Sequence, residues 1–303
     1  METKRTIITH VGTSALRCEA LTERPSFEPR DLDRALQREL EPEDYDDLRQ
    51  ACREDLQEGL RETWGPHFKE ADRRARSPAE IASLSLLNLT AEDQVVLLHP
   101  QSAGGAFCAE LIALALQDSE IPSGLGYPKA SKVTIAPVAG LRVTGDPRVD
   151  ATAANLAAEF LARGVASYVA HVWEAYQGIL PGGSLIFNIT GSYKGLVPIA
   201  RDVSLLLHGA GGRPVSCEVC YLFESGSELI RYPAFPIAAR VSQDLLDDLE
   251  RVSAEGGAGP ELLKTRGEGE WAGLFERASE TRLRLSAAGT VMRSLLPLLN
   301  QSL

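Results

Sequence analysis

The stretch SLIFNITGSYKGLVPIA, residues 184–200, decides the fold of this chain. Residues 185–189 form a short, mostly apolar run, which is typical of a strand inside a parallel sheet covered on both faces. Small residues and one lysine follow at once: Thr190, Gly191, Ser192, Lys194 and Gly195. Backbone amides at a helix start lack intrahelical partners and can face an anion, and open α/β sheets bind ligands at the carboxyl ends of their strands. We therefore predict a binding turn here, with an ordinary strand-to-helix turn as the alternative.

A second turn of this kind lies near the beginning of the chain. Residues 6–10, TIITH, predict a first strand, and Val11, Gly12, Thr13 and Ser14 follow it. Two such turns in one sheet are placed to face one ligand. A helix cap by Thr13 or Ser14 is the alternative interpretation.

The remainder of the first 240 residues alternates predicted strands and helices. We expect strands at residues 94–99, 132–137 and 215–223, helices at 78–88, 106–116 and 150–174, and a turn at 181–183. A repeated strand-helix-strand order implies a parallel sheet with helices on both faces. The predicted fold class is α/β, with a Rossmann-like domain over residues 1–240 that lacks the Gly-x-Gly-x-x-Gly dinucleotide fingerprint.

Two segments differ in character from this domain. Residues 24–77 are dense in Glu, Asp and Arg with leucines at helical spacing, which predicts a charged helical insertion with a solvated surface. Residues 241–303 predict a helix, a short β-segment at 282–286 and a final helix at 287–299, an order compatible with a small winged-helix-like domain. Glutamates offset the arginines of this tail, which favours a dimer or interdomain contact over DNA binding.

Composition narrows the classes of function. The net charge of the 303 residues is −11, the wrong sign for a protein that coats nucleic acid, so DNA binding is not expected. No apolar run is long enough to cross a bilayer, and the first residues lack the apolar core of a signal peptide, so we expect a cytoplasmic protein with no membrane association. The five cysteines are expected to be reduced, and the Cys217-x-x-Cys220 pair, alone on a predicted strand, does not predict a zinc site.

Five segments together resemble a known family. They are Val11-Gly12-Thr13-Ser14, PAEIASL at residues 78–84, QVVLLH at 94–99, FNITGSYKG at 187–195 and YLFES at 221–225. On these segments the chain resembles the CARF proteins of type III CRISPR systems, and more closely the CARF family that contains the CRISPR-associated ring nucleases. The resemblance covers residues 5–240, and the Asn-Ile-Thr-Gly-x-x-Lys-Gly turn is its most specific part. The insertion at residues 24–77 departs from the compact pattern of the family.

The resemblance implies a homodimer that binds cyclic oligoadenylate, most often the four-membered ring cyclic tetra-adenylate, across its two-fold axis. In ring nucleases a hydroxyl after the first strand and a lysine after the central strand act on the ring, and these positions carry Ser14 and Lys194. Ligand contacts are expected from Gly12, Thr13, Gln101, Ser102, Asn188, Thr190, Gly191, Ser192 and Tyr193. For Gln101 and Ser102 a helix cap is the alternative. No metal or cofactor is expected, since each ribose carries its own nucleophile, the 2′-hydroxyl beside the 3′-phosphate.

Two other classes of function remain open at this point. A ligand-gated effector would carry a HEPN ribonuclease motif, an Arg and a His four to six residues apart on a helix. Arg5 to His10 and Arg61 to His67 match that spacing. However, the first pair falls in a predicted strand, and the second lies in the charged insertion, where Pro66 interrupts any helix. A transcription regulator would use the tail to bind DNA, which its acidic balance disfavours.

Overall fold

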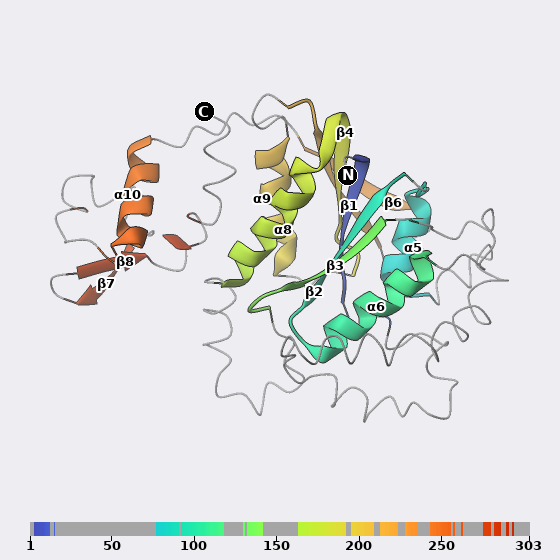
Figure 1. Ribbon diagram of the computed structural model, residues 1–303, viewed down its shortest axis with the longest axis horizontal. Coiled ribbons are helices and arrows are strands. Elements are labelled where there is room, and N and C mark those ends of the chain that lie inside the picture. Colours follow the sequence, from blue (N-terminus) through green and yellow to red (C-terminus); the bar gives the residue numbers. More distant parts are fainter. Residues whose placement is uncertain are drawn as a thin grey trace.

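The body of the structure, a computed structural model, is a six-stranded sheet with the strand order β3-β2-β1-β4-β5-β6 (Figure 1). The strands are β1 (Thr3–His10), β2 (Gln94–Pro100), β3 (Lys132–Val138), β4 (Ile179–Asn188), β5 (Ser216–Leu222) and β6 (Leu229–Pro233). The structure describes residues 3–12, 15, 77–90, 92–117, 130, 132–141, 163–191, 195–208, 213–223, 228–234, 243–255, 257, 262, 275–279, 282–285, 289, 290 and 293. Strands β1 to β5 pair with one another in parallel, and β6 is antiparallel to β5.

Helices cover both faces of this sheet (Figure 1). On one face lie α5 (Ala79–Leu86) and α6 (Ala103–Gln117), and on the other lie α8 (Val165–Gln177) and α9 (Leu196–Leu207). Successive residues of a strand point to opposite faces, so Ile7 packs in the first core and Ile8 in the second. This double burial explains the nearly continuous apolar runs in the sequence and confirms the predicted α/β, Rossmann-like class.

The order of the strands defines where the connections change direction. From β1 the chain moves outward to β2 and β3, and it then crosses back to place β4 on the other side of β1. Thr9 of β1 consequently pairs with Leu97 of β2 and with Asn188 of β4. In open α/β sheets this switch point, at the carboxyl ends of the strands, is where ligands bind.

Three details of the sequence-based prediction are wrong. The predicted turn at residues 181–183 is part of β4, because a bulge between the pairs Thr3–Ile179 and Arg5–Ser184 absorbs the extra residues, with Gly182 at φ +79°. The sheet is mixed and not wholly parallel, because β6 adds an antiparallel edge strand. The β-segment of the tail has a partner strand that the sequence analysis missed, since β7 (Phe275–Ser279) pairs with β8 (Arg282–Leu285).

The C-terminal part contains α10 (Gln243–Ala254) and the β7–β8 hairpin. Helix α10 contacts β8, and Leu249, Val252 and Leu283 are buried there. A helix beside a small hairpin is consistent with the predicted unit, whose winged-helix topology stays a prediction. The predicted insertion at residues 24–77 lies outside the described residues except for Ser77. In the part of the chain that the structure describes, no helix has the length and apolar character that crossing a membrane requires.

Candidate functional site

The turns after β1 and β4 meet at the carboxyl edge of the sheet. A Cβ atom built on Gly12 would collide with the carbonyl oxygen of Gly191 and lie 3.4 Å from its carbonyl carbon. Only glycine permits so close an approach of two backbones. The structure therefore brings together two segments that are 179 positions apart, as the sequence analysis predicted from the two similar turns.

A buried carboxylate lies between these turns. Glu80, in the first turn of α5, is fully buried, and its Oε1 accepts a hydrogen bond of 2.8 Å from the amide of Gly12. A Cβ atom on Gly191 would lie 2.5 Å from Cδ and 2.7 Å from Cγ of the same side chain. Glu80 thus occupies the space that a side chain at position 191 would need. Glu80 belongs to the PAEIASL segment of the family resemblance, but no role is predicted for it from the sequence.

Beneath the turns a chain of hydrogen bonds connects α5, β4 and β5. Asn188 is fully buried and donates from Nδ2 to Ser83 Oγ at 2.8 Å, and Ser83 Oγ donates to the Glu80 carbonyl at 3.0 Å. The hydroxyl of Thr190 donates to Asn188 Oδ1 at 2.8 Å and accepts the amide of Leu222 at 3.0 Å. These bonds hold the exit of β4, so the predicted ligand residues Asn188 and Thr190 first of all shape the turn.

Gln101 and Ser102 lie at the exit of β2 and serve local structure. Ser102 Oγ accepts the amide of Gly105 at 3.1 Å, which is the helix-cap alternative for this residue, and the side chain is buried. Gln101 Oε1 accepts the amide of Gly140 at 3.1 Å, in the turn after β3. The structure gives neither residue a hydrogen bond to the Gly12 and Gly191 turns within the described residues.

Five of the predicted site residues lie outside the described residues. They are Thr13, Ser14, Ser192, Tyr193 and Lys194. Their neighbours along the chain are described, since Gly12 and Ala15 flank the first pair and Gly191 and Gly195 flank the other three. The roles of Ser14 and Lys194 therefore stay predictions.

Two buried histidines stand at the ends of β1 and β2. His10 Nε2 lies 3.0 Å from the hydroxyl of Tyr168 on α8, and burial lowers the pKa of His10 to about 3. His99 Nδ1 lies 2.7 Å from the Pro100 carbonyl, and burial lowers the pKa of His99 to about 4 in spite of that hydrogen bond. Both imidazoles are neutral at physiological pH. The burial of these two histidines had no signal in the sequence, because it comes from helices packed far along the chain.

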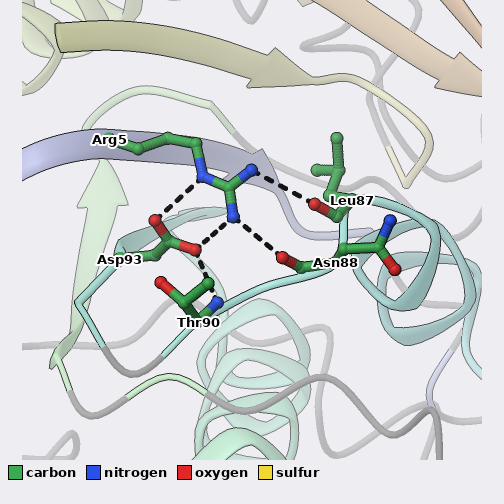
Figure 2. A network of polar contacts seen from close by, with 5 residues as sticks. All are labelled: Arg5, Leu87, Asn88, Thr90 and Asp93. Atoms are coloured by element: carbon green, nitrogen blue, oxygen red, sulfur yellow. Dashed lines mark hydrogen bonds and ion pairs between the residues drawn. The ribbon is translucent and has the colours of Figure 1, made fainter.

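The amino edge of the sheet carries a different polar network, shown in Figure 2. The guanidinium of Arg5 forms two hydrogen bonds with the carboxylate of Asp93 and donates to the carbonyls of Leu87 at 3.2 Å and Asn88 at 3.0 Å. Asp93 also accepts the amide of Thr90 at 2.6 Å. Burial acts to raise the pKa of Asp93, but the hydrogen bonds from Arg5 and Thr90 outweigh it and lower the pKa. This network ties the loop after α5 to β1, far from the two glycine turns.

The cysteine pair of β5 does not form a metal site or a disulfide. Cys217 packs in the core beneath α8 and α9, whereas Cys220 packs in the core beneath α5 and α6. The two thiols therefore point to opposite faces of the sheet, and burial raises the pKa of each to about 12. Across the residues described here, no cluster of three or more His, Cys, Asp or Glu side chains is placed to hold a metal ion.

Comparison with known proteins adds no family to these observations. No protein-family model matches the chain, and a search of the curated proteins finds no matching relative.

Proposed function

We propose that this protein is a metal-independent ring nuclease that binds cyclic tetra-adenylate as a homodimer and cleaves it to linear di-adenylate with a 2′,3′-cyclic phosphate. The observation that carries the proposal is the contact between the Gly12 and Gly191 turns at the switch point of the sheet. These are the turns whose sequences resemble the ring nucleases, and they belong to strands that are neighbours only in space. A resemblance spread over distant segments gains support when those segments converge on one place.

The proposed reaction requires few catalytic groups from the protein. The 2′-hydroxyl of each ribose lies beside the phosphate that it attacks: the new 2′-O–P bond replaces the P–O5′ bond, the 2′-hydroxyl proton passes to water, and the departing 5′-oxygen takes up a proton from water. Catalysis then consists of turning the sugar for in-line attack and stabilising the charge of the crowded phosphorane. Lys194 would supply the positive charge and Ser14 a hydrogen bond, with the amides of Thr13, Gly191 and Ser192 as further donors. The near four-fold symmetry of the ring lets a two-fold dimer treat two opposite phosphates alike. Cleavage would remove the signal molecule and so switch off type III CRISPR signalling.

The site has one notable property for an anionic ligand. The Gly12 amide already donates to Glu80, so this amide is not a phosphate donor while that bond is in place. Phosphate contacts in the proposed reaction must therefore come from the neighbouring residues of the turns, which include Ser14 and Lys194.

The test is an incubation of purified protein with cyclic tetra-adenylate in excess EDTA, with the products separated by chromatography. We expect linear di-adenylate from the wild type and a loss of rate on the order of 10²-fold or more in Lys194→Ala and in Ser14→Ala. Pro198, exposed on α9 beyond the turn, offers a control, and Pro198→Ala should cleave at the wild-type rate.

Either of two other results would contradict the proposal and favour another function. A ring that binds tightly but is recovered intact would make the protein a sensor that gates an effector ribonuclease or a transcriptional regulator. RNA cleavage that depends on the cyclic ligand would identify the effector. In either case Ser14 and Lys194 would act in binding, and residues 24–77 and 241–303 would be the segments to search for the output.

A further inference from the structure

We infer that Glu80 is a positioning residue that fixes the turn after β1 relative to the turn after β4. The inference deepens the proposed function and rests on it for its chemical consequence, but its structural part can be tested without any nucleotide. The Glu80 side chain contacts both turns: its Oε1 accepts the Gly12 amide at 2.8 Å, and its Cγ and Cδ fill the space next to Gly191.

The energetics of this placement argue against simple filling of space. Burying a carboxylate is costly unless hydrogen bonds and favourable dipoles compensate it, and an apolar side chain of similar volume would fill the same space without that cost. Here the Gly12 amide and the first turn of α5 supply compensation, because a helix start favours negative charge. A buried carboxylate aimed at a turn amide therefore fits a role in orienting that turn.

Helix α5 is held at both of its ends, so Glu80 cannot shift independently of the sheet. At its beginning, Ser83 binds the Glu80 carbonyl and is itself bound by Asn188 of β4. At its end, Arg5 of β1 binds the carbonyls of Leu87 and Asn88, as Figure 2 shows. The two strands that carry the turns thus both anchor the helix that carries Glu80.

This arrangement has a direct consequence for the proposed reaction. Ser14 follows Gly12 by two residues, and Lys194 follows Gly191 by three. The distance between the two proposed catalytic groups therefore depends on the relative placement of the two turns. A displacement of about 1 Å in such a constellation can cost about 10²-fold in rate.

The kinetic test compares Glu80→Ala with Glu80→Gln. Glutamine keeps the shape and an acceptor oxygen for the Gly12 amide, whereas alanine removes both. We expect kcat for cyclic tetra-adenylate to fall about 10²-fold in Glu80→Ala with a much smaller change in KM, and about fivefold in Glu80→Gln, because glutamine keeps an acceptor for the Gly12 amide but replaces the second carboxyl oxygen with an NH₂ group. Wild-type kcat in Glu80→Ala, or an equal loss in both variants, would overturn the inference.

Asp93→Asn is the matched control for this comparison. It changes another buried carboxylate that accepts a backbone amide, but at the amino edge of the sheet. It should lower stability and leave kcat of the folded protein unchanged. A loss of kcat equal to that of Glu80→Ala would show a general effect of destabilisation and contradict a positioning role.

The nucleotide-free test is a double-mutant cycle between positions 80 and 191. Gly191→Ala should lower the midpoint of chemical denaturation in the wild type, because the new methyl group collides with Glu80. In Glu80→Ala that space is vacant, so the same substitution should leave the midpoint unchanged or raise it. Additive effects would overturn the inference. If the wild type leaves the ring intact but the cycle shows coupling, the proposed function fails and the packing of Glu80 against the turn after β4 stands.

Discussion

The two ends of β1 carry polar clusters of opposite character. At the amino end, Arg5 and Asp93 form an ion pair that also binds three backbone groups of the α5–β2 loop. At the carboxyl end, two glycine turns touch, and Glu80 accepts the amide of Gly12. The first cluster joins charges of opposite sign and fastens a loop. The second places a carboxylate against the backbone that leads to the residues proposed to act on a ligand.

The position of a polar cluster in the fold indicates its role as much as the residues that form it. The Arg5–Asp93 pair has the stronger electrostatic signature, but it lies at the amino end of β1, opposite the carboxyl ends at which open α/β sheets bind ligands. The glycine turns carry little charge among the described residues, but they stand at the switch point. We therefore expect a structural role for the cluster at the amino end and place the proposed ligand site at the carboxyl end, and the following experiments test that division.

Acidification should produce the largest effect, and it should act on the carboxyl end first. His10 and His99 have folded pKa values of about 3 and 4, below the ordinary 6.5, so the unfolded chain binds more protons at intermediate pH. Stability is therefore lost as pH falls below 6.5, by ~2 kcal/mol for each histidine and ~4 kcal/mol together between pH 7 and pH 5. Chemical denaturation at each pH measures this.

The variant His10→Gln measures how much of that loss of stability comes from His10. Glutamine does not titrate, so about half of the loss between pH 7 and pH 5 should disappear. Asp93 should contribute nothing in this window, because a carboxyl with a lowered pKa loses its stabilising effect only as pH falls below its ordinary 3.8. An undiminished loss in His10→Gln would contradict the assignment to this histidine.

Asp93→Ala should have the next largest effect, on stability alone. It leaves the guanidinium of Arg5, whose side chain is 25% exposed, without its carboxylate and removes the acceptor of the Thr90 amide. We expect a loss of about 3 kcal/mol in the free energy of unfolding, with unchanged activity of the folded protein. Glu218→Gln, which removes the more exposed ion pair with Arg231, is the control and should cost less than about 1 kcal/mol. Equal costs for the two variants would contradict the account of the amino end.

Thr190→Val should have the smallest effect on stability but should act at the site. Valine has the shape of threonine without the hydroxyl that joins Asn188 to the amide of Leu222. We expect a loss of about 2 kcal/mol in the free energy of unfolding together with slower ring cleavage. Thr190→Ser keeps the hydroxyl and should restore the cleavage rate. If Thr190→Val cleaves as fast as the wild type, the hydrogen bonds beneath the turn do not matter for the site.

Most strands of the sheet could be predicted from the sequence, but the edge strand β6 and the bulge of β4 could not. Buried strands such as residues 185–189 and 94–99 are recognisable because both faces are covered, which makes their composition apolar throughout. Strand β6 escaped prediction because its residues are mostly exposed, with Ile230 and Tyr232 on the surface, and no periodic burial marks it. The bulge at residues 181–183 has the sequence Pro-Gly-Gly, which predicts a turn, and only pairing with β1 reveals the strand.

The contact between the two turns had a signal in the sequence, whereas the hydrogen bonds around and beneath them mostly did not. The meeting of the two turns followed from their similarity and from the geometry of parallel sheets. The cap by Ser102 also had a local signal, since a serine before an apolar helix commonly caps it. Glu80 had none, because a glutamate in the first turn of a helix is ordinarily a solvent-exposed partner of the helix dipole. Its partner Gly12 lies 68 positions away, and only the tertiary fold brings the two together.

The most direct test of the central claim is hydrogen exchange, followed by mass spectrometry, with and without excess cyclic tetra-adenylate. We predict slower exchange in peptides that cover residues 9–15 and 189–196, and unchanged exchange in peptides that cover the amino-end network at residues 87–93. Protection of the amino end alone, or no protection at either turn, would contradict the claim that the Gly12 and Gly191 turns form one ligand site.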